Sequence, residues 1–420
     1  MVRGTFTPQP MPEEIELASL PEGEGSPIER APAPPITSPA EWVHQNLFSS
    51  WWNGLITVVA GAFAAFALWQ MFEFLFVTGE WDVFRTNVRG YMVGGFPEEE
   101  LWRVWAALWF VAFLSGASWG SARRPVRWTA RAAVTRTVLV VVVLAAFLYA
   151  VDTALVWGLS AATIAFVALG AVAGRIGGRA LRRPLWIAWL LAFPLVVGIL
   201  RLFDGVPPQH WGGLLLNIIA ATVGIFVSFP IGLLLALGRR STLPAVRAVC
   251  VAFIELFRGV PLVAWLVFGQ YGLELLLPPQ LDISNIIKAM IMITLFSAVY
   301  IAEIVRGGLQ GVPVGQYEAA RALGLSTTRM MALIVLPQAL RATIPTMISH
   351  MIAVFKDTSL FAVIEFTDLL AAARRAGQSL EFSGHHKEAL LPAALLFFVI
   401  AFSMSRWSQR LERRLGVGER

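Results

Sequence analysis

Apolar stretches of about 20 residues recur along this chain, and they constrain its fold more than any other feature. A helix needs about 20 residues to cross a hydrocarbon core of roughly 30 Å. Such stretches begin near Asn53, Leu101, Thr137, Thr153, Leu185, Trp211, Ala248, Asn285, Ile344 and Ala389. The sequence therefore predicts an all-α polytopic membrane protein with about ten transmembrane helices, although the third and fourth stretches, separated only by Asp152 and Thr153, also fit a single hairpin.

The composition excludes several other classes of protein. Hydrophobic residues make up 57% of the 420 residues and charged residues 14%, which is more apolar material than one soluble core needs. The net charge is +6, but the basic residues punctuate apolar stretches instead of gathering on one solvated face, which argues against a nucleic-acid binder. Cys250 is the single cysteine, so the chain can build neither a disulfide framework nor a cysteine metal site.

The arginines predict the orientation of the spans. The loop 123–136 holds five arginines without an acid, and the loop 175–183 holds four more. Both loops are cytoplasmic under the positive-inside rule. If ten spans alternate, the stretch 306–341 falls on the same side and the acidic loop 98–100 lies outside. Both termini are then cytoplasmic.

The chain divides into four regions by composition. Residues 1–45 are rich in Pro, Glu, Gly and Ser, which predicts a disordered cytoplasmic tail without the pattern of a cleavable signal peptide. Residues 46–204 hold the leading spans and no motif that can be assigned. Residues 205–412 carry the motifs described below, and residues 413–420 form a short cytoplasmic tail.

One motif lies between the eighth and ninth predicted spans. It has the form E-A-A, three residues, G, nine residues, I-x-L-P, and its fixed positions are Glu318, Ala319, Ala320, Gly324, Ile334, Leu336 and Pro337. The spacing predicts two short helices joined by a tight corner, with Gly324 in the left-handed position and Ser326 as the next N-cap. A rigid hairpin in a cytoplasmic loop would let a separate cytoplasmic protein move the membrane helices. The alternative is an ordinary amphipathic hairpin at the interface.

With this motif, residues 211–412 resemble the permease domain of ABC importers, in the branch for polar amino acids. Five further segments carry the same resemblance: Glu255–Pro261, Ala302–Gly307, Gly315–Ala320, Leu336–Ala339 and Lys356–Leu360. The leading spans and the segment Ser405–Glu412 resemble one permease of the heteromeric general L-amino-acid importers. The resemblance implies a C-terminal five-helix type I (MetI-like) permease domain at 205–412, a coupling loop at 306–343, and a place in the bacterial cytoplasmic (inner) membrane.

The resemblance also implies partners. None of the lysines, Lys288, Lys356 and Lys387, follows glycine in a phosphate-binding loop, so ATP and Mg²⁺ are expected on two separate ATPase subunits. No predicted outside loop is long enough for a solute-capturing domain, which implies a separate amino-acid-binding protein. A second related permease subunit is expected beside this chain. The chain itself is expected to bind no cofactor and to catalyse no covalent step.

Ionisable residues inside a span are a second candidate site. Lys356 and Asp357 lie about ten residues past the expected start of the ninth span, near mid-membrane. With Thr358 and Ser359 they offer groups for the carboxylate and ammonium of an amino acid. The alternative is a Lys356–Asp357 pair that satisfies itself. His350 shares their helix face, where the family more usually has asparagine, and it serves either as a substrate contact or as a buried hydrogen-bonding group.

A repeated E-x-x-R-G pattern suggests a gate. Glu255 and Arg258 fall near the cytoplasmic end of the seventh predicted span, and Glu303 and Arg306 near that of the eighth. Each pair is able to join within its own helix, because residues three apart share a face. The hypothesis of a gate instead joins Glu255 to Arg306 and Arg258 to Glu303 when the cytoplasmic side is shut.

Two rival functions remain at the level of sequence. An ion-coupled secondary amino-acid carrier also accommodates a mid-membrane Lys356 and Asp357, but it has no use for a coupling hairpin. A membrane-embedded enzyme requires a metal cluster or a nucleophile with its base inside the spans, and we find neither. His385 and His386 are adjacent histidines on an outside loop without the spacing of a metal site, so no metal is assigned.

Overall fold

The computed structural model describes residues 38–121, 154–178, 180–276, 278, 280–281 and 283–415, and within these residues it is helical without strands. The third predicted span and the arginine loop 123–136 lie outside the described residues. The longer helices are α1 (Pro39–Leu47), α2 (Trp51–Glu73), α3 (Asp82–Val93), α4 (Leu101–Gly120), α6 (Ala154–Gly177), α7 (Arg182–Arg201), α8 (Gly213–Arg239), α9 (Pro244–Gly259), α11 (Asn285–Gln310), α12 (Val314–Ala322), α14 (Leu336–Asp357), α15 (Leu369–Gln378) and α16 (His386–Leu415).

Shorter helical segments connect the longer helices. They are the π-helices η1 (Phe74–Thr78), η4 (Phe268–Gly272) and η6 (Met331–Val335), the α-helices α10 (Leu262–Val267) and α13 (Thr327–Met330), and the 3₁₀ segments η2 (Glu98–Glu100), η3 (Pro208–His210), η5 (Leu273–Leu275) and η7 (Thr358–Ile364). Eight segments of the described chain are long and apolar enough to cross a membrane, or nine if the bent pair α9 and α10 is one span. These fit about ten spans once the third, undescribed stretch is added.

The chain forms two compact units, residues 1–79 and 80–420. In the first unit, Ser38 caps α1 and exchanges hydrogen bonds with Glu41, so a helix begins at Pro39, inside the region predicted as a disordered tail to residue 45. Helix α2 is apolar on every side and buries none of its residues, as expected of a helix surrounded by lipid.

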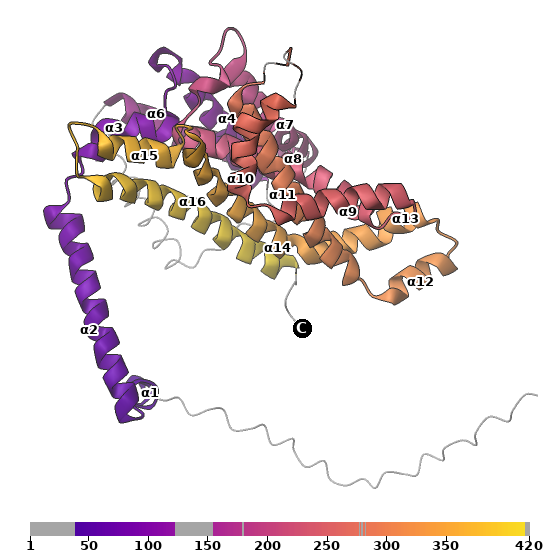
Figure 1. Cartoon of the computed structure of the whole chain (residues 1–420), viewed down its shortest axis with the longest axis horizontal. Helices are drawn as coiled ribbons and strands as arrows, with labels where there is room; N and C mark the ends of the chain where they lie inside the picture. The colour runs from indigo at the N-terminus through magenta and orange to yellow at the C-terminus, as the bar shows by residue number, and fades with distance from the viewer. Residues whose placement is uncertain are drawn as a thin grey trace, which may run out of the picture. The chain divides into compact units, whose positions relative to one another are not determined.

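The second unit joins the leading spans to the motif-bearing half. One core cluster contains Val93, Phe96 and Leu200 together with Leu216 of α8 and Ile293 of α11. Figure 1 shows α3 beside α15, and α14 beside α16, in this unit. The predicted boundary at residues 204 and 205 therefore does not separate two cores, because the apolar residues on both sides of it pack together.

The seventh predicted span is broken. Helices α9 and α10 meet at an angle of 103°. Between them Val260 is extended, with φ −120° and ψ 134°, because the ring of Pro261 disfavours a helical conformation in the preceding residue. The seventh span, predicted to begin near Ala248, is therefore bent at Pro261 and is not one straight helix.

Candidate functional site

The predicted hairpin corner lies at the end of α12. Gly324 adopts the left-handed conformation, with φ +72°, and its N–H donates to the carbonyl of Arg321 at 2.9 Å. The next amide, that of Leu325, donates to the carbonyl of Ala320 at 3.2 Å, which closes the helix end. The side chain of Ser326 then accepts from the amide of Arg329 and begins the next helix. The corner predicted from Gly324 and Ser326 is present.

The second arm of the hairpin differs from the prediction. Segments α13, η6 and α14 follow one another without a break, and residues Thr327–Ile364 form one span candidate. Ile334, Leu336 and Pro337 therefore belong to the beginning of the long membrane helix instead of a separate short one. The helix that contains the ninth predicted span begins at Thr327, well before Ile344. Pro337 is the second residue of α14 and follows the π-helix η6, so its missing N–H falls where the helical hydrogen bonding changes from the π to the α pattern.

The base of the hairpin is fixed to the bundle. Ala320 is buried in one cluster with Met330, Val335 and residues of α9 and α11. The hydroxyl of Tyr317 donates to the carbonyl of Leu309 at 3.2 Å. In contrast, Glu318, Ala319 and Gly324 are exposed. The base of the hairpin is therefore packed against the bundle, and its outer surface is exposed.

The outer surface of the hairpin is apolar at several points. Leu323, beside the corner, is 77% exposed, and Val314 and Leu333 are also exposed. Exposed large apolar side chains of this kind are candidates for contact with another protein.

The predicted gate charges form one cluster, with a member that the sequence analysis missed. Arg239, at the end of α8, contacts Glu303 at 2.6 Å and Glu255 at 3.6 Å. Arg258 contacts Glu303 at 3.6 Å and Glu255 at 3.9 Å. Arg306 contacts Glu303 on its own helix at 2.7 Å.

The cluster contains one of the two ion pairs of the gate hypothesis and lacks the other. Arg258 meets Glu303 as the hypothesis required, whereas the ion pairs of Glu255 within the described chain go to Arg239 and Arg258 and not to Arg306. Arg239 takes the place expected for Arg306, because the end of α8 lies between α9 and α11. The signal in the sequence was a basic residue at the end of a span. The sequence analysis explained Arg239 by the positive-inside rule alone and did not consider it as an ion-pair partner.

Lys356 and Ser359 line a cavity of about 650 Å³ between α14 and α16. Its other polar lining residues are Ser349 and Ser405, and Phe397 and Phe402 supply part of its apolar wall. Asp357, Thr358 and His350 are not among its lining residues. Within the described residues, neither Lys356 nor Asp357 has an ion-pair partner, which contradicts the self-satisfied pair.

The other two predicted substrate residues take part in buried hydrogen bonds. The Nε2 atom of His350 lies 2.9 Å from the hydroxyl of Ser297, which in turn donates to Ser228 at 3.0 Å. The ring of His350 also stacks on Tyr300. Thr358 is fully buried, and its hydroxyl donates to the carbonyl of Phe355 at 2.6 Å. His350 therefore fits its second interpretation, as a hydrogen-bonding group.

A polar network around Asn217 escaped the sequence analysis. The Nδ2 atom of Asn217 donates to Thr358 at 3.0 Å and to the carboxylate of Asp368 at 3.2 Å, and its Oδ1 accepts from the amide of Leu369. Asp368 also caps α15 through the amide of Ala371. A polar residue inside a span, such as Asn217, was the signal that could have identified it.

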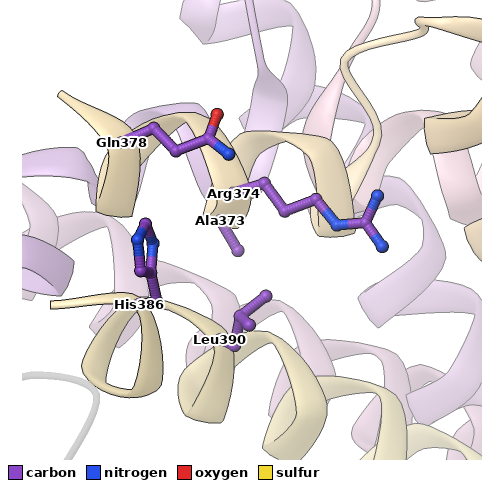
Figure 2. A pocket seen from close by; sticks show the side chains of 5 residues that line it. All are labelled: Ala373, Arg374, Gln378, His386 and Leu390. Carbon is purple, nitrogen blue, oxygen red and sulfur yellow. The ribbon is translucent and has the colours of Figure 1, made fainter. Parts of the chain in front are cut away.

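A second hollow, of about 390 Å³, lies between α15 and α16. Figure 2 shows Ala373, Arg374 and Gln378 of α15 on one side, and His386 and Leu390 of α16 on the other.

In the parts of the chain that the structure describes, no three His, Cys, Asp or Glu residues are grouped to hold a metal ion. The absence of a metal site remains a prediction for the whole chain.

Residues 228–417 match the family model described as "Binding-protein-dependent transport system inner membrane component". The inner membrane amino-acid ABC transporter permease protein YhdY of Escherichia coli (strain K12) is 35% identical over 378 residues, which cover 90% of this chain and 93% of that protein. The glutamate/glutamine/aspartate/asparagine transport system permease protein BztC of Rhodobacter capsulatus is 33% identical, with 89% of this chain and 93% of that protein covered.

A solved structure is also similar. A chain of the crystal structure of an amino acid ABC transporter with histidines is 28% identical, covers 48% of this chain and 92% of its own length, and gives a TM-score of 0.44. The relatives that cover nearly the whole chain, together with the membrane helices and the family match over the hairpin, decide the assignment. This chain belongs to the amino-acid ABC transporter permeases, within the family of binding-protein-dependent inner-membrane transport components.

Proposed function

We propose that this chain is the permease subunit through which an ATP-driven importer moves polar or acidic L-amino acids across the membrane by alternating access. Two ATPase subunits, which bind ATP and Mg²⁺, supply the energy. A second, related permease lies beside this one, and a separate binding protein delivers the substrate from outside. The chain crosses the inner membrane with both termini in the cytoplasm.

The observation that carries the proposal is the hairpin with a fixed base and a free apolar surface. Because Ala320 and Met330 are buried in the bundle, a push on α12 passes directly to α11 and α14. Because Leu323 and Val314 are exposed, they are available to enter a groove on an ATPase subunit. The residues that carry the coupling are thus Glu318, Ala319, Ala320, Gly324, Ile334, Leu336 and Pro337, with Leu323 and Val314 as the contact surface.

The cavity between α14 and α16 supports the substrate class. Its lining includes the ammonium of Lys356 and three serine hydroxyls but no acidic residue. A cationic group without an opposing acid attracts a carboxylate and repels a basic side chain. A preference for acidic and amide side chains is also consistent with the name of the Rhodobacter capsulatus relative. Asp357 and His350 lie outside the cavity lining and take secondary roles in the substrate pathway.

The charge cluster supplies the cytoplasmic gate. Glu303 joins arginines from α8, α9 and α11, so separation of these helices requires several ion pairs to break together. Closure of the ATPases, transmitted through α12, rocks the helices so that the site opens outward and then inward, and the ion pairs break when the cytoplasmic side opens.

Uptake of labelled amino acids into proteoliposomes tests the proposal. The complex is reconstituted with its binding protein, and uptake is driven either by enclosed ATP or by an ion gradient. We expect ATP-dependent uptake of acidic and amide amino acids. Lys356→Met should reduce uptake of acidic substrates at least tenfold, whereas Lys356→Arg, which keeps the charge, should retain much of it.

The outcomes separate the proposal from its rival. Uptake that follows an ion gradient without ATP contradicts the importer and supports a secondary carrier. Uptake that needs ATP but does not change in Lys356→Met leaves the importer in place and removes the cavity as its substrate site.

A further inference from the structure

Helix α9 presents three distinct faces. Cys250, Ile254 and Phe257 follow a helical spacing and pack on the bundle. Arg247, Glu255 and Arg258 lie on a second face. The third face, which we call the outer apolar face, is exposed and consists of Ala245, Val249, Ala252 and Leu256. Val249 is 69% exposed and Leu256 is 56% exposed, so nothing in the part of the chain that the structure describes covers this face.

Both ends of α9 lie at one level of the bundle. Its first residue follows a short turn after Arg239, which ends the 27-residue helix α8. Near its other end, Glu255 contacts Arg239 and Arg258 contacts Glu303. Glu303 stands about 27 Å along α11 from Asn285, so this level is at the boundary of a hydrocarbon core of roughly 30 Å.

The bend at Pro261 also distinguishes α9 from the helices inside the bundle. Helix α10 turns away from α9 by 103°, and Leu262 and Leu266 of α10 are buried in the bundle, whereas Val249 and Leu256 of α9 are exposed. Figure 1 shows α9 at the end of the unit that also carries α12 and α13.

Positive charge gathers at the corner between α8 and α9. Arg240 and Arg247 are both exposed, and within the described chain neither has an ion-pair partner. The neighbouring cluster does not neutralise them, since its three arginines already exceed its two glutamates.

We propose that α9 lies in the plane of the membrane surface at the α12 end of the bundle, with its outer apolar face in the acyl chains and Arg240 and Arg247 on the phosphates of anionic lipids. In the proposed orientation this surface is the cytoplasmic leaflet. An interfacial helix needs one apolar face and one basic edge, and α9 supplies both beside its protein-facing side.

A lipid surface fits this face better than a second protein. The outer apolar face contains only aliphatic side chains and no polar group that would orient a protein partner. Protein interface centres are rich in aromatic residues and arginine, which are absent from it. The unpaired arginines match the negative potential of an anionic bilayer. The lipid contact would hold α9, and with it Glu255 and Arg258 of the charge cluster, at a fixed depth.

The single cysteine makes a direct test possible. In a Cys250→Ser background, Val249→Cys or Leu256→Cys is labelled with a bimane fluorophore. The full chain, with the subunits that copurify, is placed in vesicles that contain both phosphatidylcholine and phosphatidylglycerol. In one preparation the phosphatidylcholine is brominated, and in the other the phosphatidylglycerol is brominated. Brominated lipid quenches a fluorophore only on contact, and comparison of the two lipids gives their relative affinity at that position.

We expect quenching at both positions, to a similar extent because α9 lies flat, and a preference for phosphatidylglycerol. Arg240→Gln together with Arg247→Gln should lower that preference by roughly fivefold per arginine removed. Arg374→Gln, on α15, is the matched control and should leave it unchanged.

Two results would overturn the proposal. Absence of quenching at both positions in a chain that elutes normally on size exclusion means that protein or water covers the face. Equal affinity for the two lipids, unaltered by the double substitution, removes the role of the arginines. Neither result depends on transport or ATPase activity, so the test is independent of the proposed function.

Discussion

At the scale of single residues, the network around Asn217 shows how a polar group is accommodated among membrane helices. Asn217, Thr358 and Asp368 are each fully buried, yet every one of them has a hydrogen-bond partner in another element or in the backbone. A buried polar group that has no partner costs several kcal/mol, so this network fixes α8, η7 and α15 relative to one another. Thr358 is therefore part of the hydrogen bonding that holds these helices together.

The carboxyl of Asp368 should make stability depend on pH. Burial raises the pKa of Asp368 above its usual value of 3.8, although hydrogen bonds from Ala371 and Asn217 oppose the increase. Because the folded pKa exceeds the unfolded one, the stability that this group contributes is greatest below pH 3.8 and decreases as pH rises through the folded pKa. Asp368→Asn does not ionise and should lack this decrease.

Thermal unfolding in detergent, followed from acid to neutral pH, checks this prediction. The wild-type midpoint should fall relative to that of Asp368→Asn as pH rises, whatever constant offset the substitution introduces through the lost hydrogen bond from Asn217. Exposed Asp204→Asn is the control and should follow the wild type. Parallel curves for wild type and Asp368→Asn would show that burial of Asp368 does not shift its titration.

The sequence predicted the structural role of single residues where that role depends only on neighbouring residues. Gly324 and Ser326 were assigned because a left-handed corner and an N-cap depend only on neighbouring residues. Asp368 and Asn217 were missed because their partners are 151 positions apart in the chain. Sequence spacing carries no information on such a contact.

At the scale of elements, helices α4 and α6 approach each other closely through glycines. A Cβ atom added at Gly170 would stand 2.1 Å from the carbonyl oxygen of Phe113, and one added at Gly116 would stand 2.1 Å from that of Val167. Gly120 and Gly174 make equivalent contacts one turn along. Such small-residue spacing lets membrane helices pack backbone to backbone.

Gly170→Leu should therefore separate α4 from α6. We expect a loss of about 1–3 kcal/mol or more in the free energy of unfolding, because backbone atoms do not move aside as a flexible side chain does. Gly158→Leu on the same helix is the matched control, since nothing lies within 4 Å of an added Cβ there. Equal unfolding midpoints for the two variants in detergent would contradict the close approach.

The elements themselves were predicted largely from apolar length, and the errors have physical causes. The break between α9 and α10 was missed because apolar residues continue through Gly259 and Pro261, although Pro261 was a visible breaker. The second arm of the hairpin was predicted as separate because the motif ends at Pro337, yet the π-helix η6 just before this proline lets the helix continue through it. The start of α1 was hidden among prolines.

At the scale of the whole molecule, the ion-pair cluster joins three helices through one carboxylate. The side chain of Glu303 is 16% exposed and contacts Arg239, Arg258 and Arg306. The sequence predicted Glu303, Arg258 and Arg306 as members of this cluster and missed Arg239. Arg239 pairs with Glu303 and Glu255 only because α8 packs beside α9 and α11. A repeated sequence motif carries no information on that packing.

Glu303→Gln should weaken the closed cytoplasmic gate, because three arginines then face one another without their shared carboxylate. If the closed state loses 1–2 kcal/mol, ATPase activity without binding protein should rise roughly 5- to 30-fold. Exposed Glu381→Gln should leave this basal activity at the wild-type level. Unchanged basal activity in Glu303→Gln, in a complex that assembles normally, would argue against the gate.

The organisation of the whole chain was predicted in part. The membrane class and the family followed from apolar periodicity and one motif. The division at residues 204 and 205 stays a prediction from composition, and the structure adds that Val93, Phe96 and Leu200 before it pack with Leu216 after it. Packing between distant helices determines where a membrane protein divides into units.

The most direct test of the account is ATPase activity of the reconstituted complex, with and without binding protein and amino acid, in three forms of the chain. Wild type and Leu323→Met, which keeps an apolar contact surface on the hairpin, should both be stimulated. Leu323→Asp should abolish the stimulation without loss of the assembled chain, because Leu323 is exposed and does not support the fold. Full stimulation of Leu323→Asp, or a chain that purifies without any ATPase, would contradict the coupling role of the hairpin.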